Sequence, residues 1–115
     1  MNRRFYPILI QMLYMNAFEL YQSEKTDEAL SMANKAIDVV SKADSKESYN
    51  PFMLRGLISD TQMETKGKAV ADYEEALDRY AAFLKQMKER MGKSDFKDPN
   101  MLNVYRNLIF IYTDQ

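Results

Sequence analysis

Apolar residues recur every three or four positions along most of the chain, and short polar segments interrupt the pattern. The recurrence is clear from Ala29 to Val40, where Ala33, Ala36 and Ile37 fall on one side of a helix. A period near 3.6 is typical of an amphipathic helix, whereas strands alternate with a period of two. No alternating segment is flanked by turn pairs, so the sequence predicts an all-α fold.

Start signals divide the chain into five predicted helices. Pro7 begins the first, which ends near Ser23, and the Thr26 hydroxyl is expected to cap the second. Asn50-Pro51 and Asp98-Pro99 each place a capping side chain before a proline. This order predicts the starts of the third and fifth helices.

Stop signals complete the division. The polar segment 44–48 ends the second helix, and the third is expected to reach about Glu64. Gly67 marks the turn before the fourth helix, and Gly92 is a natural residue just past its end. The fifth helix should reach about Tyr112.

The second and fourth predicted helices carry small residues at matching positions of their buried stripes. The matched positions, 40 residues apart, are Ala29, Ala33 and Ala36 in one helix and Ala69, Tyr73 and Ala76 in the other. Small residues let two helix backbones approach closely, with a large neighbour filling the gap. We therefore interpret these positions, together with Ala17 and Gly56, as structural.

Here the chain resembles the tetratricopeptide repeat. The segment 68–77 looks very like the second helix of that family, and Phe52, Arg55 and Gly56 match its first helix by spacing. The spacing of 40 residues is longer than the family's repeat of about 34, and the fourth helix overruns the usual end. The resemblance covers nearly the whole chain.

The resemblance implies an α–α superhelix of about five antiparallel helices, two pairs and the first helix of a third. We expect residues 1–115 to form a single domain that is a fragment of a longer protein. The fifth helix is apolar on several sides, where a terminal capping helix would show a polar face. Dimerisation that covers this helix is the alternative.

The family binds its ligands mainly through the first helix of each pair. Carried over by matched spacing, the resemblance implies a partner-binding face on the first, third and fifth helices. Its residues are Gln11, Tyr14, Phe18, Tyr21, Met53, Leu54, Leu57, Asp60, Asn103, Arg106, Asn107 and Phe110. Because Tyr14 and Phe18 stand where a carboxylate clamp would need Lys and Asn, we predict no capture of a C-terminal carboxylate.

Composition narrows the chemistry. Lys plus Arg number 16 and Asp plus Glu 17, so a net charge of -1 gives no footprint for nucleic acid. The chain has no His and no Cys, which removes the commonest general base and metal ligand and any thiolate chemistry. We therefore predict no enzymatic activity, no cofactor and no metal site.

The N-terminus has the outline of a secretory signal, with Arg3 and Arg4 before an apolar run. Pro7 and Gln11 interrupt the run, no small-x-small cleavage site follows, and the run is too short to span a bilayer. We expect an ordinary helix without membrane insertion. The compartment stays open between cytosol and periplasm.

These observations favour a module that binds a protein or peptide, as a scaffold or sensor part of a larger bacterial protein such as a signalling or regulatory protein. The alternative is a structural homo-oligomerising bundle, with a homodimer as its simplest form. Tyr80, Leu84, Met87 and Met91 motivate it, because they continue a near-heptad apolar stripe on the long fourth helix.

Overall fold

The structure is a computed structural model, and it describes residues 3–61, 66–92 and 97–113. Over these residues the chain forms a short 3₁₀ turn, Arg3–Phe5, and five α-helices with no strand. The helices are α1 (Tyr6–Gln22), α2 (Thr26–Ala43), α3 (Asn50–Asp60), α4 (Lys66–Met91) and α5 (Pro99–Thr113). The all-α prediction is confirmed.

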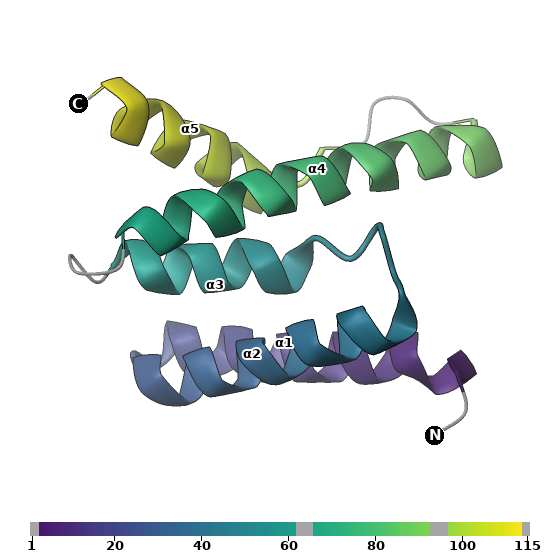
Figure 1. Ribbon diagram of the computed structural model, residues 1–115, viewed down its shortest axis with the longest axis horizontal. Helices are drawn as coiled ribbons and strands as arrows, with labels where there is room; N and C mark the ends of the chain where they lie inside the picture. The colour runs from purple at the N-terminus through teal and green to yellow at the C-terminus, as the bar shows by residue number, and fades with distance from the viewer. Residues whose placement is uncertain (1–2, 62–65, 93–96, 114–115) are drawn as a thin grey trace.

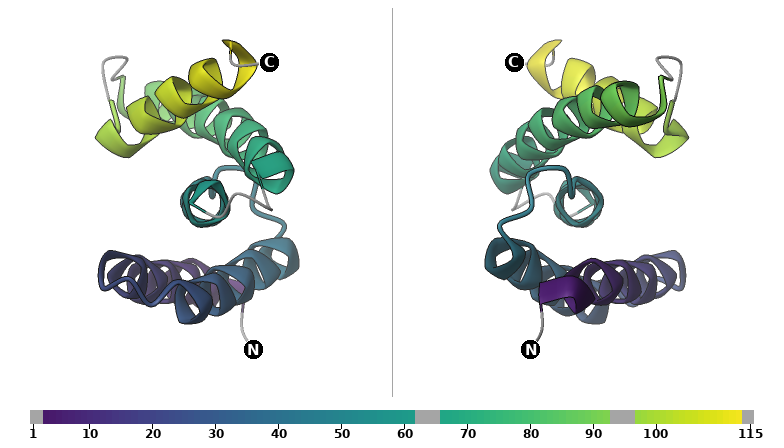
Figure 2. Two further views of the ribbon diagram at one scale, coloured as in Figure 1. Left: turned by 90° about the vertical axis from the view of Figure 1, so that its left-hand side faces the viewer. Right: turned by 90° about the vertical axis from the view of Figure 1, so that its right-hand side faces the viewer.

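The helices are arranged as two antiparallel pairs and a fifth helix. α1 packs along α2, and α3 packs along α4 (Figure 1). α3 lies between the layer of α1 and α2 and the layer of α4 and α5 (Figure 2). It therefore contacts each of the other four helices.

Two of the predicted helix ends are confirmed in detail. Oδ1 of Asp98 accepts a hydrogen bond of 2.9 Å from the Asn100 N–H, which caps α5. Gly92 follows α4 with a φ of +68°, and its N–H donates to the Lys88 carbonyl at 2.9 Å. A left-handed φ suits glycine, because glycine has no Cβ to clash.

Other boundary predictions are wrong. Thr26 is the first residue of α2 and makes no side-chain cap, and the residue before α3 is Tyr49 rather than Asn50. Gly67 lies inside the first turn of α4. α3 already ends at Asp60, whereas the predicted end at Glu64 lies outside the described residues.

The close approach predicted for Gly56 is present where α3 crosses α4. A Cβ on Gly56 would lie 2.6 and 2.7 Å from Cδ1 and Cε1 of Tyr73. Distances this short would force the ring or the helix to move. The predicted structural alanines Ala17, Ala29 and Ala69 are fully buried as well.

An ion pair joins the same two helices. The guanidinium of Arg55 on α3 donates two hydrogen bonds of 2.8 Å to the carboxylate of Asp72 on α4. Its Nη1 donates a third, of 3.0 Å, to Oδ1 of Asn34 on α2. Asp72 is buried, so water screens the charge of its carboxylate poorly. Through its charge-assisted hydrogen bonds, Arg55 connects three helices.

The stripe that motivated the homo-oligomer is interrupted at its first residue. Tyr80 is buried, its ring lies 4.8 Å from that of Tyr49, and its hydroxyl accepts a hydrogen bond of 3.0 Å from the Asp98 N–H. Leu84 is only half-buried, and Met91 is exposed. Among the described residues, no helix has the length and apolarity needed to cross a membrane.

Candidate functional site

A row of aromatic side chains runs along α1. Tyr14, Phe18 and Tyr21 follow Gln11 at the i, i+3, i+7 and i+10 spacing that places residues on one helix face. The ring centroids of Tyr14 and Phe18 are 5.9 Å apart, and those of Phe18 and Tyr21 are 6.3 Å apart. Each end of this row borders a pocket.

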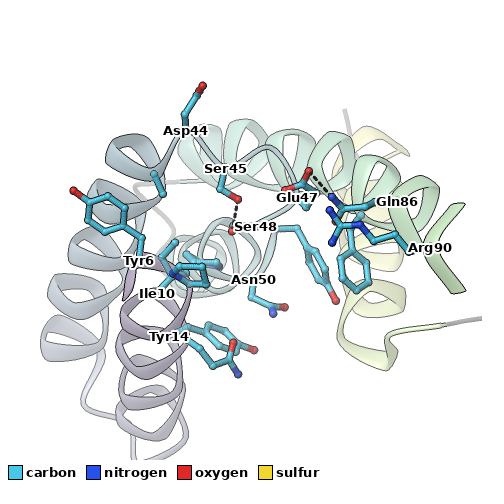
Figure 3. A pocket seen from close by; sticks show the side chains of 16 residues that line it. Tyr6, Ile10, Tyr14, Asp44, Ser45, Glu47, Ser48, Asn50, Gln86 and Arg90 are labelled. Atoms are coloured by element: carbon cyan, nitrogen blue, oxygen red, sulfur yellow. Dashed lines mark hydrogen bonds between the residues drawn. The ribbon is translucent and has the colours of Figure 1, made fainter. Parts of the chain in front are cut away.

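The first pocket, of about 630 Å³, lies beside the N-terminal half of α1 (Figure 3). Its other walls are the segment between α2 and α3, the start of α3 and the C-terminal half of α4. The lining side chains are Tyr6, Pro7, Ile10, Gln11, Tyr14, Ala43, Asp44, Ser45, Glu47, Ser48, Tyr49, Asn50, Pro51, Phe83, Gln86 and Arg90. The volume falls in the usual range of ligand pockets, roughly 300–1,000 Å³.

Polar contacts fasten the wall between α2 and α3 to α4. Nη1 of Arg79 donates to the Ser45 carbonyl at 2.6 Å, and Nε2 of Gln86 donates to Oε1 of Glu47 at 3.3 Å. The Arg79 guanidinium also lies 4.4 Å from the centre of the Phe52 ring. Contacts within the protein thus fix the position of this wall of the pocket.

Asp98 joins the first pocket to the start of α5. Its Oδ2 accepts a hydrogen bond of 2.6 Å from the Tyr49 hydroxyl. Burial raises the pKa of Tyr49, and the hydrogen bond to Asp98 raises it further. Burial also raises the pKa of Tyr14 to about 12, with a smaller contribution from the negative charge of Asp98.

The second pocket, of about 240 Å³, is built by α1, α3 and α5 together. Its lining residues are Tyr21, Leu57, Asp60, Thr61, Asn107, Phe110 and Ile111. An adjoining hollow shares Tyr21 and Thr61 and is completed by Gln22, Glu24 and Thr26. Three helices that are far apart in the sequence therefore meet at one concavity.

A hydrogen-bonded network borders the second pocket. The Tyr73 hydroxyl donates to Oδ2 of Asp60 at 3.0 Å and accepts from Nδ2 of Asn107 at 3.2 Å. Burial raises the pKa of Tyr73, the Asn107 hydrogen bond lowers it, and Asp60 raises it. Tyr73 therefore connects the Gly56 crossing to Asp60 and Asn107 at the pocket.

The predicted face is divided by the structure. Gln11 and Tyr14 border the first pocket, and Phe18 lies between the two pockets on the α1 row. Five predicted residues line the second pocket: Tyr21, Leu57, Asp60, Asn107 and Phe110. The structure thus brings five of the twelve predicted residues together at the second pocket.

Four predicted residues lie elsewhere. Met53 and Leu54 are fully buried, so they stabilise the core and offer no surface to a partner. Asn103 and Arg106 on α5 are exposed and line neither pocket. The prediction for Met53 and Leu54 fails because α3 is enclosed by its neighbours.

Sequence reasoning missed most of the first pocket. Phe83, Gln86 and Arg90 belong to the C-terminal half of α4, and Tyr49 and Asn50 follow the polar segment 44–48. The length of the fourth predicted helix and the polar segment were both visible in the sequence. They were the available signal for this pocket.

Comparison with known proteins gives no match: no family model, no curated protein and no solved structure matches this chain. Among the described residues, no group of three or more acidic side chains is placed to hold a metal ion. The two pockets and their lining residues are therefore the basis for assigning a function.

Proposed function

We propose that the chain is a tetratricopeptide-like module that binds a segment of another protein or a peptide. One observation carries the proposal: α1, α3 and α5 jointly line the second pocket. These are the helices from which the resemblance expects ligand contacts. The resemblance alone places the module in a larger bacterial protein of signalling or regulatory type.

The α1 row sets the size of the partner segment. Ten residues separate Gln11 in the first pocket from Tyr21 in the second, which is about 15 Å along a helix. An extended peptide advances about 3.3 Å per residue. A ligand that fills both pockets therefore needs about five residues and an anchor side chain near each end.

The pocket chemistry supports binding of a peptide chain. Gln11, Asn50 and Gln86 in the first pocket carry amides that both donate and accept hydrogen bonds, as a peptide backbone requires. Ile10 and Phe83 supply apolar surface beside them. Such a mixture of apolar walls and a few polar groups is typical of a specific binding pocket.

Selection of a displayed library of random seven-residue peptides on the immobilised chain tests the proposal. Phe110→Ser should greatly reduce binding of the enriched peptides, because Phe110 lines the second pocket. Ile109→Ser is the matched control, since Ile109 is its equally exposed neighbour (63% against 65%) and lies outside that pocket. Enrichment of no peptide, or equal loss in both variants, would reject the second pocket as a peptide site.

A second candidate function, homo-oligomerisation, is favoured by a separate surface. Leu102, Tyr105, Ile109 and Tyr112 form an exposed apolar stripe along α5. A stripe of this kind is costly in water unless something covers it. Light scattering after gel filtration at two concentrations tests it, because a self-associating chain would lose mass in Ile109→Ser and retain it in Phe110→Ser.

A further inference from the structure

The charged side chains that line the second pocket and the adjoining hollow have one sign. Asp60 is the charged residue among those that line it, and Glu24 is the charged residue that lines the adjoining hollow. Asp60 forms no ion pair with any residue that the structure describes, in contrast to Asp38, Asp72 and Glu75. The local field therefore favours a cation.

The carboxylate of Asp60 retains capacity to accept hydrogen bonds. Tyr73 donates one hydrogen bond to Oδ2, at 3.0 Å, whereas an ionised carboxylate offers about four lone-pair positions. Asn107 donates to the Tyr73 hydroxyl. Tyr73 thus holds Asp60 at the border of the pocket without neutralising its charge.

The remaining walls suit the stem of a long basic side chain. Leu57, Phe110 and Ile111 supply apolar surface, and Lys and Arg bury their methylene stems against such surface while the charged end reaches a polar partner. Tyr21 also lines the pocket, and an aromatic ring is a favourable neighbour for a cation.

Other side chains fit less well. An apolar anchor would cover Asp60 and remove its water without supplying a partner, which is unfavourable for a carboxylate. An acidic anchor would be repelled by Asp60 and Glu24. The first pocket has no such selectivity by charge, because Arg90 there is accompanied by Glu47 and Asp44.

We propose that the second pocket selects a lysine or arginine side chain of the bound segment, with Asp60 as the group that recognises its charge. This inference rests on the proposed peptide-binding function and specifies its partner as a short segment with a basic anchor. The first pocket, about five residues away along the ligand, takes its other anchor.

The test repeats the library selection on the full chain and on Asp60→Asn. The asparagine keeps an oxygen that can accept from Tyr73, so the network and the fold should persist. Asp38→Asn is the matched control, because the Asp38 side chain is 70% exposed on α2. Circular dichroism during thermal unfolding checks that all three proteins fold.

We expect the wild-type chain and Asp38→Asn to enrich peptides that carry Lys or Arg. A synthetic copy of an enriched peptide should bind Asp60→Asn about tenfold more weakly, the size of a lost charge-assisted hydrogen bond. Replacing its basic residue with norleucine should weaken binding to the wild type and leave binding to Asp60→Asn nearly unchanged.

The outcomes separate the two proposals. Peptides enriched without a basic residue, or bound equally by Asp60→Asn, would overturn the charge selectivity and leave peptide binding intact. If no peptide is enriched by any of the three proteins, peptide binding and the basic anchor are both rejected.

Discussion

The two helical pairs achieve close packing with different side chains. In the pair of α1 and α2, the fully buried alanines Ala17, Ala29 and Ala33 share one cluster. In the pair of α3 and α4, Gly56 lies against the ring of Tyr73. The first pair depends on small apolar residues, whereas the second depends on one large ring that fits against a residue without a side chain.

Among the residues that the structure describes, polar side-chain contacts also join the two helices of the second pair. Arg55 and Asp72 join its two helices, and the Tyr73 hydroxyl extends to Asp60 and Asn107 at the second pocket. The ion pair described on α2, Asp38 with Lys42, lies within one helix and is exposed. The difference teaches that stability would be coupled to the proposed partner binding in the second pair, because Tyr73 packs against Gly56 and also contacts Asp60 and Asn107 at the second pocket.

The largest effect is expected from Tyr73→Ala, which should lower the free energy of unfolding by about 3–5 kcal/mol. The substitution leaves a cavity that Gly56 cannot fill, and it removes the hydroxyl between Asp60 and Asn107. Urea denaturation followed by circular dichroism measures it. Tyr73→Phe keeps the ring and should cost only about 1 kcal/mol; equal costs for the two variants would refute the role of the ring.

The second-largest effect is expected from Arg55→Met, which should lower the free energy of unfolding by about 2–3 kcal/mol. Methionine retains much of the stem but leaves the buried carboxylate of Asp72 without its cation. The control is Lys42→Met, which breaks the exposed pair with Asp38 and should change stability by less than about 0.5 kcal/mol. Similar urea midpoints for the two variants would show that the Arg55–Asp72 pair adds little.

Opposite changes of one methyl group contrast the two pairs directly. Gly56→Ala should destabilise the chain by about 1–3 kcal/mol, because the new Cβ meets the Tyr73 ring and outweighs the better helix propensity of alanine. Ala33→Gly should also destabilise it, by about 1–2 kcal/mol, because it removes a buried methyl and loosens the helix. Thermal unfolding measures the stability of both variants. A Gly56→Ala variant that is more stable than the wild type would show that the helix crossing has space for a methyl group.

The sequence predicted the outer helices better than the middle one. The periodic stripe of α2 and the Tyr73 position on α4 were correct because one face of each long helix is buried and the other is exposed. α3 is short and is contacted by four helices. Met53 and Leu54, which were expected to face a partner, are therefore as buried as the α3 residues that pack against its neighbours. A helix buried on all sides loses the contrast on which periodicity depends, and the binding face was therefore assigned too many α3 residues.

The pockets depend on contacts that local pattern does not encode. Asp72 lies in an acidic stretch, and only the tertiary placement of Arg55 makes it a buried ion-pair partner. The first pocket requires the polar segment 44–48 to meet the C-terminal end of α4. Both contacts join residues more than fifteen positions apart, where spacing rules give no register.

The smallest effect on stability is expected from alkaline pH, which ionises one tyrosine of each pair without a mutation. The pKa of Tyr14 on α1 is raised to about 12, and that of Tyr73 on α4 is raised as well, in both cases mainly by burial. Unfolded tyrosine releases its proton near pH 10. Both groups therefore contribute stability that is complete below about pH 10. This stability is lost as the pH rises from there through the raised pKa of each native tyrosine, because deprotonation favours the unfolded chain.

Urea midpoints measured across this range should fall for the wild type and fall less steeply for Tyr14→Phe and Tyr73→Phe. Comparing the proteins at the same pH cancels the titration of lysines, which all of them share. Ultraviolet absorbance of tyrosinate should show that part of the eight tyrosines titrates late in the native chain. One common midpoint near pH 10 for all eight would contradict the burial of Tyr14 and Tyr73. A smaller slope for Tyr73→Phe alone would locate the sensitivity in the second pair, where the same hydroxyl borders the proposed basic-anchor pocket.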